Sequence, residues 1–379
     1  MPVKDGLAKQ RKAKLLYLPY WRFKGLSYKV LDQRQFKSSL LDTTVSAFTG
    51  IDTVSSLGIR PQVATLNLAV NGNHLIPAQR NAKEALDIAE KRLLQFEKNT
   101  VLFERFIGET QCLIYAPFIL TEFPKRGTYV LKGIWGRCPG QEIDKSKITA
   151  LLKSLDGSSQ HNYLHFLPLI CPECGYNLPA VSGAVALLCQ NCSRAWWVKR
   201  NQFSPLAYKA FKIPSSSKDS RFLPFWHLTL ELSGLPIKSR YDMRLLAMSY
   251  RKLPEAWSRE AVQLLIPAFK LGPKLFLRVA RNMSLAPIDM SRKDQGLKTG
   301  QRTEPVRFPL EEAARAAKVV LSDLLKKHSK LYSLIPKTRL TLKHTGLIYL
   351  PFKFQGREFV GLHSGQAIPA DSIERGRVI

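Results

Sequence analysis

The sequence predicts an α+β fold in which two related β-rich halves, each with a long helix, flank an inserted cysteine-rich module. Three observations support this class. Four of the six cysteines form two Cys-x-x-Cys pairs near the middle of the chain, a short aromatic-x-Pro-aromatic motif occurs four times, and two segments have the apolar spacing of amphipathic helices. The predicted segments are a basic arm over 1–14, a first half over 15–160, the module over 161–213 and a second half over 221–379.

The aromatic-x-Pro-aromatic motif marks four predicted strands. It occurs at residues 17–20, 115–118, 222–225 and 349–352. Aromatic side chains favour strands, and proline is tolerated at the start of a strand because no ladder donor is needed there. We therefore expect the four motifs on strands, with the prolines at strand starts and Pro19 at a strand start or on an edge strand. The alternative is that such short strings recur by chance.

Two helices are predicted over 81–98 and 309–328. In the first, Leu86 and Ala89 lie on one face, as the 3.6-residue period requires. In the second, Pro309 stands at the start, where its missing N–H carries no penalty, and two glutamates in the first turn complement the helix dipole. Both segments therefore carry the signals of stable surface helices.

The order of these features is the same in both halves of the chain: a motif, a Leu-Gly segment, a helix and a second motif. The Leu-Gly segments are Leu57-Gly58 and Leu271-Gly272. We interpret this order as an internal duplication, in which residues 15–140 and 222–370 superpose.

The cysteine pairs predict a metal site formed by Cys171, Cys174, Cys189 and Cys192. Fourteen residues separate the pairs, and four thiolates that arrive on two tight turns satisfy a tetrahedral metal with no open position. Gly175 supplies the backbone freedom that the first turn needs, whereas Ser193 stands where the second turn often has glycine. The alternative is four free or disulfide-bonded cysteines.

The string Cys-Pro-Glu-Cys-Gly at 171–175, followed by Cys-Gln-Asn-Cys at 189–192, resembles a zinc ribbon over about residues 165–200. That resemblance implies one structural Zn²⁺ in a knuckle-and-hairpin module. The strings Tyr-Leu-Pro-Tyr-Trp-Arg-Phe-Lys-Gly at 17–25 and Ser-Leu-Gly-Ile-Arg-Pro-Gln-Val at 56–63 resemble a group of uncharacterised bacterial proteins that also carry a ribbon. This second resemblance implies a bacterial origin and offers no activity.

The charge of the chain indicates an anionic partner. There are 58 Lys and Arg residues against 29 Asp and Glu, a net charge of +29. Such an excess opposes compaction unless an anion offsets it, so nucleic acid, an acidic protein surface and an anionic membrane face are all candidate partners. A solvated surface without a partner is the remaining interpretation.

If nucleic acid is the partner, we expect its contacts in three places: the arm, the ribbon edge and a polar loop before the second helix. Lysine and arginine would neutralise phosphates, and Trp197 would stack a base. The predicted binding residues are Lys9, Arg11, Lys12 and Lys14 of the arm, Arg194, Trp197, Lys199 and Arg200 of the ribbon edge, and Arg292, Lys293, Lys298 and Arg302 of the loop.

No catalytic motif is visible in the sequence. It contains no Gly-x-Gly-x-x-Gly, no Gly-x-x-x-x-Gly-Lys-Ser/Thr and no His-Glu-x-x-His. We therefore expect a non-catalytic, basic zinc-ribbon protein that binds nucleic acid or a ribonucleoprotein. The alternative is an accessory or assembly subunit that docks on an acidic complex or on the cytoplasmic membrane surface, and an enzyme is left open. Without a signal peptide or an apolar run of membrane-spanning length, the expected location is the cytoplasm.

Overall fold

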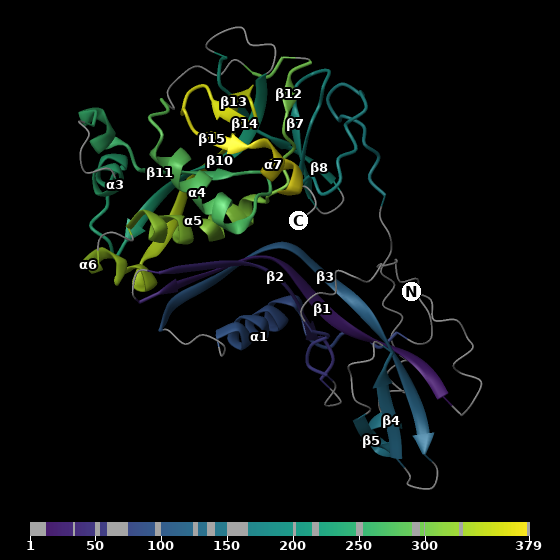
Figure 1. Ribbon diagram of the computed structural model, residues 1–379. Coiled ribbons are helices and arrows are strands. Elements are labelled where there is room, and N and C mark those ends of the chain that lie inside the picture. Colours follow the sequence, from purple (N-terminus) through teal and green to yellow (C-terminus); the bar gives the residue numbers. More distant parts are fainter. Residues whose placement is uncertain are drawn as a thin grey trace. The chain divides into compact units, whose positions relative to one another are not determined.

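The computed structural model describes residues 13–32, 35–49, 54–58, 75–94, 100–123, 128–134, 141–149, 166–199, 202–213, 220–247, 253–289, 296–298, 300–325 and 329–376. These residues form two curled antiparallel sheets with short helices (Figure 1). The chain divides into two compact units. The first comprises Met1–Gly25, Leu40–Lys98 and Gly108–Leu164, and the second comprises Leu26–Ser39, Asn99–Ile107 and His165–Ile379.

The predicted fold class is wrong. The structure is mostly β, and it does not consist of two halves that each carry a long helix. Within the range predicted over 81–98 the helix α1 spans Ala82–Leu94, and within 309–328 the helix α5 spans Leu310–Leu325. The strands β1 (Ala13–Leu31), β3 (Val101–Phe123) and β13 (Arg339–Gln355) have 19, 23 and 17 residues. The strands predicted from the sequence begin or end at the prolines, whereas the observed strands run through them.

The first sheet has the strand order β2-β1-β3-β4-β5, in which β2 spans Phe36–Ser46, β4 spans Thr128–Gly133 and β5 spans Gln141–Asp144. The division between the units cuts β1, β2 and β3. In the first unit, Leu18, Tyr20 and Phe118 belong to one buried cluster, and the rings of Tyr20 and Phe118 stack at 6.4 Å. Lys14, predicted as part of a basic arm, is an exposed residue of β1.

The parts of β1 and β2 that belong to the second unit pack on its helices. The hydroxyl of Tyr28 donates a hydrogen bond to the carbonyl of Pro273 at 2.9 Å, and its ring lies 6.5 Å from that of Phe276. Phe36 meets Tyr332 edge to face at 6.4 Å. Aromatic contacts therefore join this strand pair to α4 (Pro273–Leu285) and α6 (Ser329–Tyr332).

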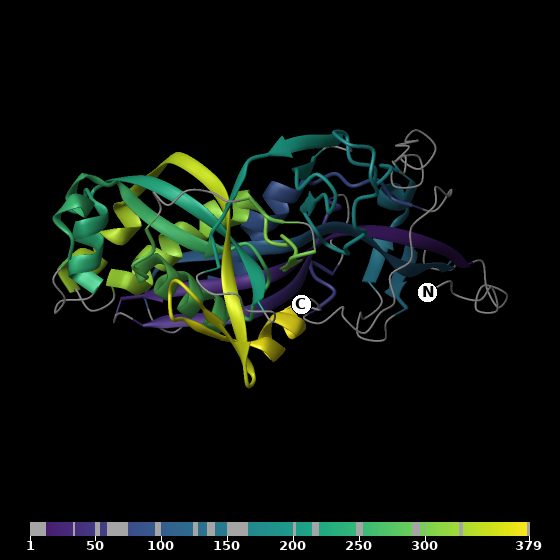
Figure 2. The same ribbon diagram turned by 90° about the horizontal axis from the view of Figure 1, so that it is seen from above.

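The second sheet has the order β11-β10-β13-β14-β15, with β12 beside β10 and β9 beside β13. Its remaining strands are β9 (Tyr208–Ala210), β10 (Ser220–Ser233), β11 (Val262–Pro267), β12 (Arg302–Thr303), β14 (Glu358–Gly361) and β15 (Ala367–Pro369). The long strand β13, drawn in yellow-green, is strongly curved (Figure 2). It pairs antiparallel with β10, with Phe225 opposite Ile348, and the register shifts between Thr229 and Leu230.

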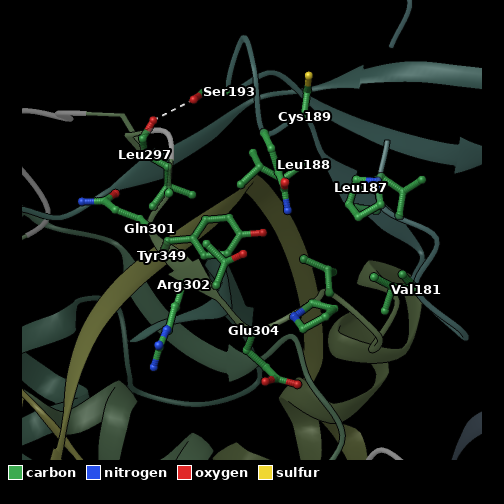
Figure 3. A pocket seen from close by; sticks show the side chains of 18 of the residues that line it. Val181, Leu187, Leu188, Cys189, Ser193, Leu297, Gln301, Arg302, Glu304 and Tyr349 are labelled. Carbon is green, nitrogen blue, oxygen red and sulfur yellow. Dashed lines mark hydrogen bonds between the residues drawn. The ribbon is translucent and has the colours of Figure 1, made fainter. Parts of the chain in front are cut away.

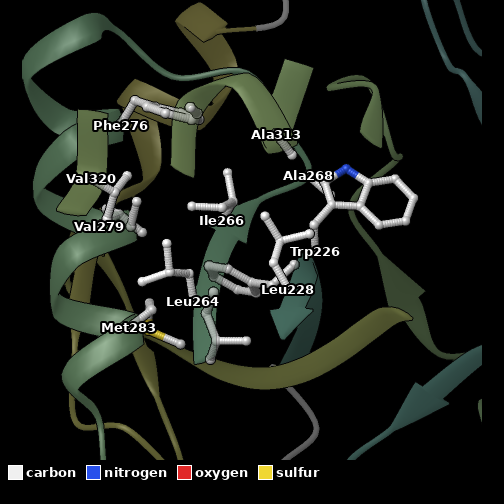
Figure 4. Packing of buried hydrophobic residues seen from close by; sticks show 14 of the residues in the cluster. Trp226, Leu228, Leu264, Ile266, Ala268, Phe276, Val279, Met283, Ala313 and Val320 are labelled. Atoms are coloured by element: carbon white, nitrogen blue, oxygen red, sulfur yellow. The ribbon is translucent and has the colours of Figure 1, made fainter. Parts of the chain in front are cut away.

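The main core of the second unit lies between this sheet and the helices α4 and α5 (Figure 4). Leu264 and Ile266 of β11 are buried there together with Val279 and Met283 of α4. The buried face of α5 carries alanines such as Ala313, which allow its backbone to approach the sheet closely. Each fully buried aliphatic or aromatic side chain contributes about 1.5–3 kcal/mol, so this layer needs no metal to be stable.

Smaller elements complete the second unit. They are the helices α3 (Arg240–Ala247) and α7 (Ala370–Gly376), the 3₁₀ turns η3 (Glu255–Arg259) and η4 (Ile335–Lys337), and a three-stranded sheet β6-β7-β8 formed by Ala186–Leu188, Ala195–Lys199 and Gln202–Leu206. Among the described residues, no helix has both the length and the apolar run that a membrane crossing requires.

All four motif prolines lie inside strands rather than at strand starts. Each proline carbonyl accepts a hydrogen bond from the residue that directly follows a neighbouring strand: Ala47 to Pro19 at 2.9 Å, Ile134 to Pro117 at 3.3 Å, Ala268 to Pro224 at 3.0 Å and Leu362 to Pro351 at 3.0 Å. Because proline has no N–H, it cannot return the second bond of an antiparallel pair. Each motif therefore lies where the neighbouring ladder ends.

Two of these endings show the same set of contacts. The carbonyl of Ala47 accepts bonds from the N–H groups of Gln79 and Arg80, just before α1, at 2.8 and 3.0 Å, and the indole of Trp21 donates to the Arg80 carbonyl at 2.7 Å. The equivalent contacts lie before α5. The N–H groups of Arg307 and Phe308 donate to the carbonyl of Ala268 at 2.9 and 3.0 Å, and the indole of Trp226 donates to the Phe308 carbonyl at 2.7 Å. Because proline cannot donate to the alanine opposite it, the carbonyls of Ala47 and Ala268 are free to accept hydrogen bonds from the residues at the start of a helix.

Candidate metal centre

Two matching turns carry the four cysteines. In the first, the N–H of Cys171 donates to the carbonyl of Tyr176 at 2.8 Å, and the N–H of Gly175 donates to Cys171 at 2.9 Å. In the second, the N–H of Cys189 donates to the carbonyl of Arg194 at 2.8 Å, and the N–H of Ser193 donates to the carbonyl of Cys189 at 3.1 Å. Each pair of sulfur atoms is therefore fixed by backbone bonds that close within six residues.

The four sulfur atoms form one cluster, and all lie within 4.8 Å of one another. The Sγ atoms of Cys171 and Cys192 are 3.7 Å apart, and those of Cys174 and Cys189 are 3.6 Å apart. A disulfide would need about 2.05 Å. A tetrahedral ion with bonds of about 2.3 Å places its sulfur ligands about 3.8 Å apart. The cluster therefore has the spacing of a closed metal site, and the predicted grouping of these cysteines is confirmed.

Hydrogen bonds to the sulfur atoms favour the thiolate form of Cys174 and Cys171. The backbone N–H of Tyr176 and the side chain of Asn191 lower the pKa of Cys174 to about 6. Burial opposes ionisation of Cys171, but the N–H groups of Cys174 and Glu173 and the side chain of Cys192 outweigh it and lower its pKa. Burial raises the pKa of Cys192 to about 12. Because thiolates are the species that bind metals, the donors around Cys174 and Cys171 favour metal binding, whereas Cys192 loses its proton only when a cation replaces it.

The ribbon around the cysteines has only a small core. Leu178, Leu187 and Trp196 are buried with Cys171 and Cys189 in a separate cluster. So few apolar side chains provide little stability for a segment that runs over 166–199, and small domains of this kind depend on a metal or disulfides. A metal bound here would therefore act mainly as a structural element.

Ser193 explains how the second turn functions without glycine. It has a φ of +57°, the single positive value among the described non-glycine residues, and it matches Gly175 at +70°. Its hydroxyl donates to the carbonyl of Leu297 at 2.8 Å, and its carbonyl accepts from the hydroxyl of Tyr208 at 2.7 Å. The strained residue thus joins the ribbon to the second sheet, a contact that glycine could make only in part.

Replacing Ser193 tests this balance between strain and anchoring. We expect Ser193→Ala to destabilise the protein by about 1 kcal/mol, because the hydroxyl bond is lost and the left-handed backbone is kept. Ser193→Gly loses the same bond but recovers about 1 kcal/mol of backbone strain, so its unfolding free energy should stay close to that of the wild type. Denaturant unfolding monitored by tryptophan fluorescence measures both. Equal losses in the two variants would contradict the strained backbone.

The structure places the predicted binding residues as follows. Arg194 lies 3.8 Å from Glu173, and Lys199 lies 3.4 Å from Glu311, both as exposed pairs that contribute little stability. Trp197 stacks on Trp226 at 5.1 Å, and the Lys199 ammonium lies 4.6 Å from its ring centre. Lys298 and Arg302 line one pocket. Lys9, Arg11, Lys12, Arg200, Arg292 and Lys293 lie outside the described residues.

The pocket that contains Lys298 and Arg302 was not predicted. It has a volume of about 590 Å³ and lies between the ribbon, the segment 297–306 and Tyr349 (Figure 3). At its side Glu304, 1% exposed, pairs with Arg221 at 3.6 Å and with Arg307 at 3.1 Å. In the sequence, Tyr349 stands out only as part of a strand motif. No sequence signal singles out Glu304, because it stands in a loop of ordinary polar composition.

Comparison with known proteins finds no family model, no curated protein and no solved structure that matches this chain. The resemblance of residues 171–192 to a zinc ribbon therefore stands on the sulfur cluster and its two turns.

Proposed function

We propose that the chain is a basic zinc-ribbon protein that binds nucleic acid, alone or within a ribonucleoprotein, in the cytoplasm. Zinc is proposed as the metal because four thiolates at tetrahedral spacing suit it best and leave no position for substrate or water. The ion would fold the ribbon and take no part in chemistry. Cys171, Cys174, Cys189 and Cys192 are its proposed ligands.

The observation that supports nucleic acid as the partner is the net charge of +29. Phosphates neutralised by lysine and arginine release condensed counterions, so a surface of this kind binds nucleic acid without a pocket or a base-specific contact. In the described part of the chain, Arg194 and Lys199 lie on the ribbon and Lys298 and Arg302 on the loop beside it. Their exposed carboxylate partners, Glu173 and Glu311, are weak competitors for a phosphate.

Salt dependence is the direct test of this proposal. The logarithm of the binding constant for single-stranded RNA should fall linearly with the logarithm of the salt concentration, by about 0.7 for each phosphate contact. The double variant Arg194→Gln, Lys199→Gln should therefore flatten the slope by about 1.4 if both residues contact phosphates. Fluorescence anisotropy with labelled RNA and duplex DNA from about 0.05 to 0.3 M salt gives the slopes.

The matched control is Lys337→Gln, Arg339→Gln, which removes two exposed charges away from the ribbon. Its slope should equal that of the wild type, and thermal unfolding should be similar in all three proteins. Equal slopes in the two double variants would remove the ribbon from the proposed surface. Binding too weak to detect at micromolar protein and about 0.1 M salt would remove nucleic acid as the partner.

A second candidate is a non-catalytic accessory or assembly subunit that docks on an acidic protein complex or on the cytoplasmic membrane surface. Exposed apolar side chains near the first knuckle favour it: Phe166, Ile170 and Tyr176 are 90%, 50% and 52% exposed. Apolar patches of this kind are typical of protein contacts. Purification from cells with a stoichiometric protein or lipid, and without nucleic acid, would support this candidate.

A further inference from the structure

The pocket beside the ribbon has the size and the lining of a small-molecule site. Its volume of about 590 Å³ falls within the range of about 300–1,000 Å³ that ligand pockets occupy. Val181, Leu187 and Leu188 of the ribbon line the pocket together with Leu297 (Figure 3). Val306 also lines it and pairs with Ala186 of the ribbon. These aliphatic walls suit a flat ring.

A buried hydroxyl points into this space. Tyr349 is 3% exposed, and its ring meets Tyr208 edge to face at 5.6 Å. Its hydroxyl makes no hydrogen bond to any described residue, and it points between Leu187, Leu188 and Glu304 (Figure 3). The hydroxyl lines the pocket, where a ligand atom can donate or accept a hydrogen bond. Tyr349 thus supplies one polar contact deep in the pocket.

The charge of the lining is positive at the exposed edge. Lys298 and Arg302 are exposed, and neither has a carboxylate within ion-pair distance among the described residues. Glu304 does not offset them, because both of its oxygens face arginines, Arg221 and Arg307. Two unpaired cations at the edge of this mixed polar and apolar pocket suit an anionic group of high charge, such as a phosphate.

We propose that this pocket binds a phosphate monoester on a ring-bearing body. The ring lies between the aliphatic walls, the hydroxyl of Tyr349 bonds to its polar edge, and Lys298 and Arg302 hold the phosphate. Two sources share this chemistry: a free nucleoside monophosphate, and the 5′-terminal nucleotide of a single strand. The second source rests on the proposed function, whereas the first is independent of it.

The test uses the full chain loaded with zinc, because Cys189 and Ser193 of the ribbon line the pocket. Isothermal titration at about 0.1 M salt compares adenosine 5′-monophosphate with adenosine. We expect the nucleotide to bind at least about 10-fold more tightly, since bonds to a charged group contribute about 1.5–3 kcal/mol. Hexauridylate with a 5′-phosphate, compared with its 5′-hydroxyl form, tests the strand end in the same way.

Variants separate the pocket from general charge attraction. Tyr349→Phe should weaken the binding of adenosine 5′-monophosphate about 5-fold. It should not lower the thermal stability, because the lost hydroxyl has no partner among the described residues of the free protein. Lys298→Gln, Arg302→Gln should weaken it at least about 10-fold. The control Lys337→Gln, Arg339→Gln should leave the affinity unchanged.

The outcomes distinguish the two proposals. A 5′-phosphate preference that Lys298→Gln, Arg302→Gln abolishes, together with weaker strand binding in Tyr349→Phe, assigns the pocket to a strand end, and tight binding of the mononucleotide alone assigns it to a free nucleotide. No detectable binding of either phosphate probe at millimolar concentration, or an equal affinity in Tyr349→Phe, overturns the pocket proposal. If 5′-hydroxyl hexauridylate then still binds with a steep salt slope, the surface function stands without the pocket.

Discussion

Replacing Cys174 with serine is expected to weaken metal binding by more than about 100-fold. Even residues that only orient a metal ligand cost 10–100-fold when they are replaced, and serine removes the ligand itself. The wild type should contain about one zinc per chain, and the variant close to none. Elemental analysis of protein purified without chelator measures both. A wild type without metal would contradict the assignment.

The same variant should loosen the ribbon and leave the second sheet folded. The ribbon has a small cluster of its own, around Leu178 and Trp196, whereas the core under α4 and α5 is large and includes Ala186 as its one buried residue from the described part of the ribbon. Hydrogen exchange should therefore speed up over 166–199 and stay slow over β10 and β13. Cys112→Ser is the matched control, since this half-buried thiol belongs to the first unit and should not affect the metal content.

The metal site could be predicted from the sequence because its geometry is local. Each turn is closed by a hydrogen bond from a cysteine to the residue five positions later. The Cys-x-x-Cys spacing in the sequence therefore determines the geometry of each turn. The role of Ser193 could not be predicted in this way. Its hydroxyl bonds to Leu297, 104 residues away, and only the folded second unit shows why a strained serine replaces glycine.

The error in the fold prediction concerns the lengths of the strands that contain the motif prolines. The four motifs were correctly placed on strands, but Pro19 and Pro224 were expected at strand starts because proline cannot donate to a ladder. In the structure the strand continues, and the neighbouring strand ends instead. The bonds that replace the missing donor come from Arg80 and Phe308, which are distant in the chain. Local patterns therefore found the strands and missed their length.

The pocket could not be predicted because its lining is assembled from separate segments. The ribbon contributes Leu187, the loop contributes Lys298 and Arg302, and the strand β13 contributes Tyr349. The two basic residues were chosen from the sequence for their charge alone. Their place at the edge of a pocket depends on the contacts that join the ribbon to the second sheet, including the bond from Tyr208 to Ser193.

Removing the carboxylate of Glu304 is expected to destabilise the second unit by about 3–5 kcal/mol. Glu304 is 1% exposed, and its backbone N–H donates to the carbonyl of Phe222 at 2.8 Å, so it is fixed beside β10. Its two oxygens compensate Arg221 and Arg307, whose side chains are 27% and 11% exposed. In Glu304→Ala both guanidinium groups remain in place without a counter-charge, which is the costly way to break a buried ion pair.

The matched control is Glu231→Ala, which breaks the pair of Glu231 and Lys343 on the surface of the same sheet. This pair is shorter, at 2.5 Å, but its side chains are 62% and 56% exposed. We expect a loss of only about 0–1 kcal/mol, because water compensates both charges and salt screens them. Urea unfolding of both variants at about 0.1 M salt measures the difference. Equal losses would show that burial does not decide the strength of these pairs, and would contradict the role given to Glu304.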